Sequence, residues 1–377
     1  MAGVSAAAAF AAAVYGGSGC SLTRKATASS TATATVTETF SQTPTATETA
    51  VYRGQRMLAV ELGKAANNNL VSSMNWVNAA GVQAVSLGGD WLVLEQTPSV
   101  YNLPPLVDPL SYVDQMNTQV LLVLRPVGGW WKLVPDDLYS TDWDDPALIA
   151  RFDAFLDAVL GSPYVSAQRL AGLYLGLDVD MHFGTDAADW ARYTTFFQAA
   201  AAHARTVRPG LPVGVLATYD GLTGSQAPFL QALNATADVI GVADWLVDGN
   251  WYARAPGAIG GQFDAVAARY PGRLVDYVRW GYPSSPRNQS SDEQQRKFVA
   301  ETFRAWDRHV SDVRVVCFST ENDLANDELN YWQEWYASSN PRCVELLRSV
   351  GLRRFPGAGD EKPAWAEMRS AAWARGW

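Results

Sequence analysis

The sequence contains only three histidines and three cysteines among its 377 residues. His182 is the one histidine near the end of an expected strand, and the spacing of the three does not match a zinc site. A Gly-x-Ser-x-Gly motif is absent, so the usual nucleophile turn of serine hydrolases is excluded. Asp178, Asp180 and Asp220 could offer oxygens to calcium, but this pattern is not specific. We therefore expect neither a metal nor another cofactor.

A surplus of positive charge is also missing. Lys and Arg together number 29 against 38 Asp and Glu, which gives a net charge of −9 at pH 7. An acidic chain without a basic block is poorly suited to nucleic acid or to an anionic membrane surface. Hydrophobic residues make up 48% of the chain and charged residues 18%, as in a globular protein with a large core. Its 15 tryptophans either pack in that core or line a sugar-binding cleft.

The N-terminal region lacks a hydrophobic run long enough for a confident membrane span. Residues 1–20 are mostly small and apolar and resemble a secretory signal, or a lipoprotein signal that ends at Cys20. Residues 21–55 are rich in Ser and Thr, so they cannot bury a core and are expected to form a disordered stalk. We expect a secreted or cell-surface protein, with a lipid anchor at Cys20 as one route.

If the protein is exported, two cysteines could form a disulfide and two asparagines could be glycosylated. In an oxidising compartment Cys317 and Cys343 could form a disulfide, and the alternative is two free buried thiols. Asn234 and Asn288 begin glycosylation sequons, which would make the chain a glycoprotein only in a eukaryotic source.

From about residue 56 the sequence alternates between apolar, strand-like runs and helix-like segments. The runs have the continuous Val, Leu and Ile character of strands buried on both faces, at 57–62, 82–87, 119–126, 170–180, 212–218, 238–244, 274–280 and 313–319. Helical spacing of apolar residues occurs between and after them, at 69–81, 108–116, 147–160, 187–207, 227–235, 261–270, 292–310 and 343–352. This pattern predicts an α/β fold, a (β/α)8 TIM barrel over 56–377. The alternative, an open doubly wound sheet, normally has a glycine-rich turn after its first strand, and ELGKAANNN is not one.

Polar side chains stand at the C-terminal end of nearly every expected strand, where barrel enzymes keep their chemistry. The ionisable ones are Glu61, Asp90, Arg125, Asp178, Asp180, Asp220, Asp244, Arg279, Glu321 and Asp323. Aromatic residues are interleaved with them, namely Trp91, Trp130, Trp131, Tyr219, Trp245, Trp280 and Tyr282. For any single residue, a charge can simply mark the point where a strand becomes a loop. The ring as a whole predicts a polar cleft that binds substrate.

Four stretches resemble the retaining (β/α)8 glycosidases, in particular endo-β-galactanase-like and endo-β-glucanase-like barrels. They are LAGLYLGLDVDMHF, RPGLPVGVLATYDGL, RWGYPSSP and EKPAWAEM, and the resemblance covers most of residues 56–370. In the family that the chain resembles, strand four typically ends in Gly-Asn-Glu-Val-Asp, and the Glu is the general acid/base. Strand seven of that family ends in a nucleophilic Glu followed by Gly-Tyr-Pro-Ser-Ser.

This chain departs from that pattern at both catalytic positions. Leu177 replaces the Asn, Asp178 replaces the acid/base Glu, and Arg279 stands where the nucleophile would be. Retaining hydrolysis needs two carboxyl groups about 5–5.5 Å apart. A guanidinium, with a pKa above about 12, can act neither as nucleophile nor as base. We expect Arg279 to form a buried ion pair with Asp178, Asp180 or Glu321 instead.

The resulting prediction is an exported, glycosidase-like barrel without retaining catalysis, which binds glycan in its cleft or serves as a structural extracellular module. The candidates for sugar stacking are tryptophans 91, 130, 131, 245 and 280, with core packing as the alternative for each. Copies of itself and other extracellular proteins are further candidate partners. The alternative function is an active hydrolase of β-linked polysaccharide that uses Asp178 with a relocated carboxylate, Asp244, Glu321 or Asp323.

Overall fold

The computed structural model describes residues 50–63, 70–104, 106, 109–110, 113, 118–166, 169–336, 338–354 and 360–377. The predicted signal-like segment 1–20, with Cys20, lies outside the described residues, and so does most of the predicted stalk. The same holds for most of the short helix predicted at 108–116.

The described strands form a barrel. Its parallel strands are β1 (Met57–Glu61), β2 (Ala84–Asp90), β3 (Gln119–Gly128), β5 (Leu170–Leu177), β6 (Val213–Gly214), β7 (Leu216–Thr218), β8 (Val239–Asp244), β9 (Leu274–Trp280) and β10 (Val313–Phe318). Their order is β6-β5-β3-β2-β1-β10-β9-β8-β7, and only Val215 separates β6 from β7. The sheet therefore returns to its starting strand, which confirms the predicted TIM barrel over an open sheet. The two-residue strand β4 (Trp131–Lys132) pairs antiparallel with β3.

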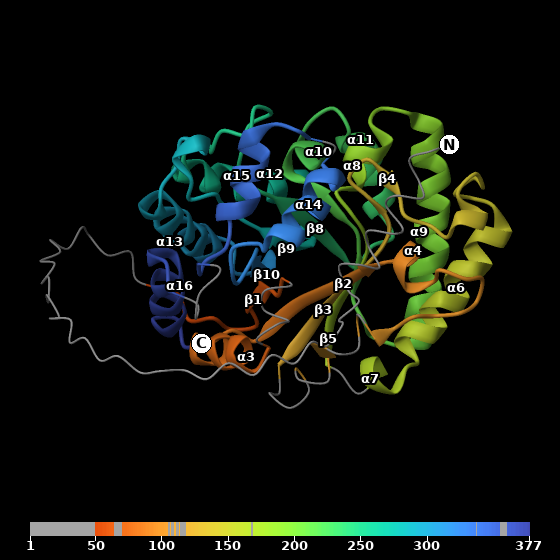
Figure 1. The fold of residues 1–377 in the computed structure, drawn as a ribbon, viewed down its shortest axis with the longest axis horizontal. Helices are drawn as coiled ribbons and strands as arrows, with labels where there is room; N and C mark the ends of the chain where they lie inside the picture. The colour runs from red at the N-terminus through yellow and green to blue at the C-terminus, as the bar shows by residue number, and fades with distance from the viewer. Residues whose placement is uncertain are drawn as a thin grey trace, which may run out of the picture.

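Helices surround this sheet (Figure 1). They are α3 (Leu70–Ala79), α4 (Trp91–Leu94), α6 (Pro146–Leu160), α7 (Pro163–Ser166), α8 (Val179–Phe183), α9 (Ala187–Val207), α10 (Tyr219–Thr223), α11 (Ala227–Asn234), α12 (Ile259–Arg269), α13 (Asp292–Arg308), α14 (Asn326–Trp335), α15 (Pro341–Ser349) and α16 (Pro363–Trp373). Short 3-10 turns occur at Asp136–Leu138, Pro256–Ala258 and Pro286–Asn288.

Local sequence explains where several of these helices begin. Asp145 and Ser291 accept hydrogen bonds from the backbone N–H of Ala147 and Gln294, so each caps the helix that follows. The strand predicted over 170–180 ends earlier, at Leu177. The reason is that Asp178 has a left-handed backbone, with φ of 52°, and α8 starts directly after it.

Long apolar stretches of the described chain are confined to the core. No helix among the described residues combines the length and the apolar character that a bilayer span requires. Strand residues such as Leu58, Val85, Leu122 and Val316 are fully buried, as their continuous apolar runs predict.

Candidate functional site

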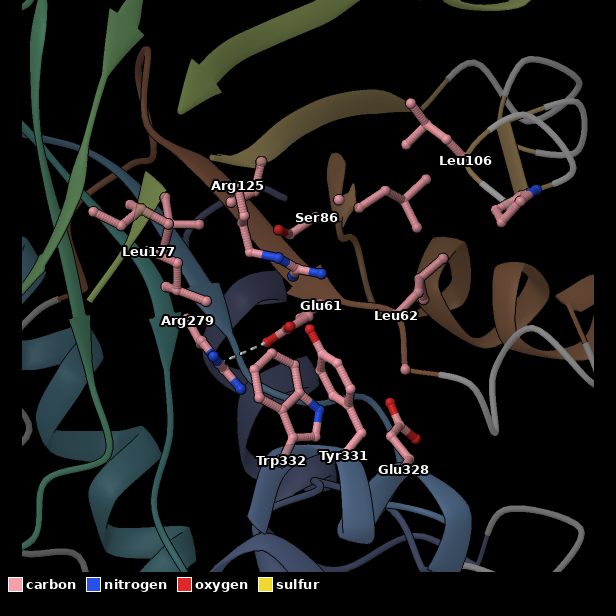
Figure 2. A pocket seen from close by; sticks show the side chains of 17 residues that line it. Glu61, Leu62, Ser86, Leu106, Arg125, Leu177, Arg279, Glu328, Tyr331 and Trp332 are labelled. Carbon is pink, nitrogen blue, oxygen red and sulfur yellow. Dashed lines mark ion pairs between the residues drawn. The ribbon is translucent and has the colours of Figure 1, made fainter. Parts of the chain in front are cut away.

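A pocket lies at the C-terminal ends of the barrel strands and encloses about 830 Å³, open solvent included. Strands β1, β2, β3 and β9 and helix α14 supply its polar wall, which consists of Glu61, Ser86, Arg125, Arg279, Glu328 and Tyr331 (Figure 2). Apolar side chains of the barrel interior also line it, namely Val123, Leu177, Leu216 and Val278. Three of the predicted site residues therefore meet here, Glu61, Arg125 and Arg279.

A β-bulge directs Arg279 into the wall of this pocket. Toward β10, Val278 pairs with Cys317 and Trp280 with Phe318, so Arg279 has no partner in the ladder. The pairing with β8 also passes over Arg279, together with Val278, between Tyr277 and Trp280. The backbone φ of Arg279 is 69°, a conformation that is uncommon for a residue with a side chain. Bulges of this kind re-aim a side chain next to a functional site.

The guanidinium of Arg279 lies against two indole rings, Trp245 and Trp332, which together form an indole clamp. The central carbon of the guanidinium lies 3.7 Å from the ring centre of Trp332 and 4.7 Å from that of Trp245. Such cation–π contacts stabilise a desolvated cation by about 2 kcal/mol or more. The side chain is only 4% exposed.

The ion pair of Arg279 differs from the sequence prediction. Its Nε lies 3.8 Å from Oε2 of Glu61, and within the described residues no other carboxylate comes as close. The predicted pairing with Asp178, Asp180 or Glu321 is therefore wrong, because the bulge turns the guanidinium toward β1. At 3.8 Å this contact is too long for a hydrogen bond.

Asp178 directly follows β5, at the strand-four position of the barrel, and is buried. The Tyr336 hydroxyl donates to its Oδ2 at 3.3 Å and accepts from Nε1 of Trp245 at 2.6 Å. Burial raises the pKa of Asp178 to about 6, although the positive charge of Arg279 opposes this shift. Asp178 is thus a carboxyl group of suitable acidity, but the residue is only 4% exposed and lies beneath Tyr336.

Helix α14 lies across the barrel mouth and presents an aromatic face to it (Figure 2). Tyr331 donates to Asp90 at 2.6 Å, and Asp90 in turn accepts from Nε of Arg125 at 2.5 Å. The guanidinium of Arg125 lies 5.7 Å from the ring centre of Trp332 and 5.4 Å from that of Trp335.

The fit of α14 against β3 depends on a glycine. A Cβ atom on Gly128 would lie 2.0 Å from the ring of Trp335, so no larger residue is compatible with the helix in this position. Sequence reasoning missed α14, although the run NYWQEWY places its aromatic residues at helical spacing.

The predicted carboxylates of the neighbouring strands do not line the pocket. Asp180 accepts from the backbone N–H and the hydroxyl of Thr218, at 2.7 and 2.6 Å, and burial raises its pKa. Asp220 pairs with Arg254 at 2.7 Å. Burial raises the pKa of Asp244 to about 7, and Nε2 of Gln262 donates to it at 3.4 Å.

Glu321 and Asp323, after β10, face the C-terminal part of the chain instead. Lys362 donates from Nζ to Asp323 at 2.5 Å. Burial raises the pKa of Asp323 to about 6, and Lys362 opposes the shift. Glu321 is fully buried, which raises its pKa to about 7 against the opposing charge of Arg353.

The predicted aromatic residues divide into core and surface. Trp91 packs on Phe152 and Phe155, Trp280 donates to Thr302, and Tyr282 donates to the carbonyl of Arg254; the three lie at 0 to 1% exposure. Trp91 and Trp280 therefore pack in the core, which was the alternative to sugar stacking, and neither of them lines the pocket.

Two predicted tryptophans are open to solvent. Trp130, in the turn between β3 and β4, is 53% exposed, and Trp131, the first residue of β4, is 40% exposed. Nε1 of Trp131 donates to the carbonyl of Glu334 in α14, which places this turn beside the barrel mouth. Trp245 belongs to the clamp on Arg279, and Tyr219 is partly buried at the start of α10.

The remaining cysteine and sequon residues are buried. Cys317 and Cys343 are free thiols, and burial raises the pKa of both. Asn234 and Asn288 are 1% and 0% exposed, and Nδ2 of Asn288 donates to two backbone carbonyls. The folded chain presents neither amide at its surface. Within the described ranges, no three His, Cys, Asp or Glu side chains are grouped so that they could hold a metal ion.

No family model matches this chain, and neither does any curated protein. Solved structures do match. A GH5_18 protein from Streptomyces cattleya, in complex with GlcNAc, has a TM-score of 0.66 at 15% identity, over 86% of this chain and 80% of its own. An exo-β-1,4-mannosidase from Opitutaceae bacterium strain TAV5 has a TM-score of 0.64 at 16% identity, over 85% of this chain and 59% of its own.

A third structure extends this comparison. A xylanase 10C variant from Cellvibrio japonicus, in complex with xylopentaose, has a TM-score of 0.60 at 14% identity, over 86% of this chain and 69% of its own. The chain spans less than two thirds of the length of the mannosidase. At these identities the likeness concerns the fold. The protein therefore has the fold of the (β/α)8 glycoside hydrolases, the proteins that its strand-four and strand-seven motifs also resemble.

Proposed function

We propose that the protein binds a glycan at the mouth of its barrel and does not catalyse retaining glycoside hydrolysis. The observation that carries this proposal is Arg279 at the strand-seven position, whose guanidinium lies against both Trp245 and Trp332. A cation held there disfavours an oxocarbenium-like transition state, and it supplies no nucleophile. Asp178, the remaining carboxyl group of the resembled pair, lies beneath Tyr336.

A hydrolase with a relocated carboxylate receives less support. Asp244, Glu321 and Asp323 are the candidates, and none of them lines the pocket. Asp323 forms an ion pair with Lys362, and Glu321 is fully buried. A general base must come within hydrogen-bond reach of the water that it activates, and none of these three carboxyl groups faces the pocket.

Glycan binding is supported by the chemistry of the pocket wall. Hydroxyl, carboxylate and guanidinium groups converge on it from five elements, and sugars are recognised by such mixed donors and acceptors. Trp130 and Trp131 add exposed, flat rings beside the mouth. Two of the structural neighbours were solved with GlcNAc and xylopentaose. We further propose, from residues 1–55 of the sequence, that the barrel acts outside the cell.

The proposal is tested by measuring binding and turnover together. Wild-type protein is titrated calorimetrically with β-1,3-, β-1,4- and β-1,6-linked glucan, galactan, mannan and xylan oligosaccharides. The same mixtures are then analysed chromatographically for released sugar. We expect saturable binding of at least one oligosaccharide without product. Release of product would overturn the loss of catalysis, and absence of all binding would favour a structural module that works through its outer surface.

A further inference from the structure

The contact between Arg279 and Glu61 has a gap that a ligand can fill. Nε of Arg279 and Oε2 of Glu61 are 3.8 Å apart and point toward each other in the pocket (Figure 2). Nε and Nη1 of Arg279 are buried and donate to no acceptor among the described residues. Buried N–H groups without an acceptor cost about 1–3 kcal/mol each, and more when charged. The pocket wall therefore holds donors that lack an acceptor.

The clamp explains why the protein itself does not close this gap. Trp245 and Trp332 both contact the guanidinium, and the bulge fixes its backbone. Glu61 is held in turn by the hydroxyl of Ser319. Neither side chain can move toward the other without losing these contacts.

We propose that a sugar hydroxyl bridges Arg279 and Glu61, and that the pocket recognises the neutral terminal sugar of a glycan. This inference rests on the proposed function. An oxygen about 2.9 Å from both atoms spans a gap of this length at a normal hydrogen-bond distance. A hydroxyl can accept from Nε and donate to Oε2 at the same time, whereas a carboxylate can only accept and an ammonium can only donate.

The charges around the pocket favour a neutral ligand. Arg125 and Arg279 face it with two positive charges, and Glu61 and Glu328 face it with two negative ones. Asp90 adds a further negative charge behind Arg125. A uronate would bring an unmatched negative charge next to Glu61, and an amino sugar would bring a positive charge next to Arg279. Burying an unpaired charge is strongly unfavourable.

The shape of the pocket favours a chain end. Val123, Leu216 and Val278 belong to the barrel interior and line the pocket, so a sugar that enters cannot continue through the barrel. On the strand-four side, Tyr336 contacts Asp178 and the ring of Trp335 packs on Gly128 of β3, so these two side chains cover this side of the mouth. This arrangement favours a glycan that enters by its end over one that runs along the cleft in both directions.

Neutral and charged oligosaccharides distinguish this inference from general glycan binding. Wild-type protein is titrated with cello-, manno- and β-1,4-galactotetraose, and with tetragalacturonate and chitosan tetramer as acidic and basic counterparts. We expect one neutral tetrasaccharide to bind at least tenfold more tightly than either charged one. We also expect the Kd of this neutral oligosaccharide, calculated per oligosaccharide molecule, to stay constant as further sugar units are added to it. Equal or tighter binding of a charged oligosaccharide, or affinity that rises with chain length, would overturn the inference and leave the proposed function standing.

Variants test the bridging hydroxyl itself. Arg279→Met keeps an unbranched chain against the indoles and removes the donors, and Glu61→Gln keeps the shape and removes the charge. Each is expected to weaken binding of the neutral tetrasaccharide tenfold or more. Because one hydroxyl joins both groups, the double variant should lose little beyond the weaker single variant. Arg205→Met, which removes an exposed guanidinium paired with Asp238, serves as the control with unchanged affinity.

Thermal unfolding checks that each variant is folded, and Arg279→Lys replaces Arg279→Met if that variant is not. Lysine keeps the charge but lacks the planar N–H pair, so the same loss of affinity is expected. Wild-type affinity in a folded Arg279 or Glu61 variant would overturn the inference. If no oligosaccharide of any class binds the wild type, the proposed function fails and the inference fails with it.

Discussion

At the scale of the residue, Arg279 combines a strained backbone with an aromatic environment. Its positive φ costs on the order of 1 kcal/mol or more and persists only where the surroundings hold it. The rings of Trp332 and Trp245 and the carboxylate of Glu61 provide these stabilising contacts, and the contact with Trp332 is the shortest. The conformation of Arg279 is thus stabilised by specific neighbours in the folded protein.

Replacing this cation by a carboxylate should destabilise the protein. Arg279→Glu would place a second negative charge close to Glu61 and against the negative faces of Trp245 and Trp332. We expect the free energy of unfolding to fall by about 3–5 kcal/mol, as when a buried ion pair loses one partner. Urea unfolding of Arg279→Glu beside Arg279→Met measures this, and the methionine variant should lose clearly less. Equal stabilities would show that the charge of Arg279 is not what the clamp stabilises.

At the scale of the element, α14 decides which part of the mouth is accessible. Gly128→Ala should loosen this helix, because the added Cβ would lie 2.0 Å from the ring of Trp335. We expect a loss of about 1–3 kcal/mol in the free energy of unfolding, typical of overpacking, and faster hydrogen exchange at the amides of Asn326–Trp335.

Gly249→Ala is the matched control for this change, since nothing lies within 4 Å of a Cβ at that position. It should leave both the stability and the exchange of α14 unchanged. If Gly128→Ala also leaves α14 protected, the helix is anchored by contacts other than the one between Trp335 and β3.

The turn between β3 and β4 should contribute to binding without contributing to stability. Trp130→Ala removes a half-exposed ring beside the mouth, and we expect about fivefold weaker binding of the neutral tetrasaccharide by calorimetry. The melting temperature should hardly change, as is usual for surface positions. Trp373→Ala removes a 59% exposed ring from α16 and should leave the affinity unaltered. A similar loss from both variants would mean that the effect is not specific to the mouth.

The elements differ in how far sequence alone predicts them. The eight barrel strands follow from their continuous apolar runs, because a parallel strand buried on both faces has no other pattern. The positions of Asp178 and Arg279 at the strand ends follow equally well. The partner of Arg279 does not, since it depends on a one-residue bulge that leaves no trace in the apolar pattern.

Burial of the aromatic residues was harder to predict for a related reason. A tryptophan after a strand can point into the core or toward the mouth. Trp91 is buried in the core, whereas Trp130 is exposed beside the mouth. A regular alternation of strands and helices predicts one helix after the last barrel strand, and the segment 343–352 already accounted for it, so α14 was not expected before that segment. Its aromatic spacing was the one available signal.

At the scale of the whole molecule, several carboxyl groups keep their protons to unusually high pH. Burial raises the pKa of Asp178 and Asp323 to about 6, and of Asp244 and Glu321 to about 7. In the unfolded chain such groups lose their protons near about pH 4. Between these values the folded state binds more protons, so its stability is greatest on the acid side and falls as the pH rises through the folded pKa.

We therefore expect the free energy of unfolding, measured with urea, to decrease from about pH 5 to about pH 8. In Glu321→Gln the total decrease in the free energy of unfolding over this range should be smaller by about 3 kcal/mol, because a shift of one pKa unit corresponds to about 1.4 kcal/mol. Glu293→Gln is the control, since a hydrogen bond from Arg296 lowers the pKa of Glu293 and its titration ends below this range. An unchanged slope in Glu321→Gln would show that Glu321 is ionised in the folded protein throughout.

The indole clamp also constrains how this centre can change over evolutionary time. A codon change that introduced a carboxylate at position 279 would place it against two ring faces and next to the charge of Glu61, with Asp178 still in contact with Tyr336. Such a change would lower the stability of the folded protein before it could provide a carboxyl pair. Under the proposed function, related chains should therefore exchange residues 279 and 332 together, and a carboxylate at position 279 should occur only where α14 lacks these aromatic residues.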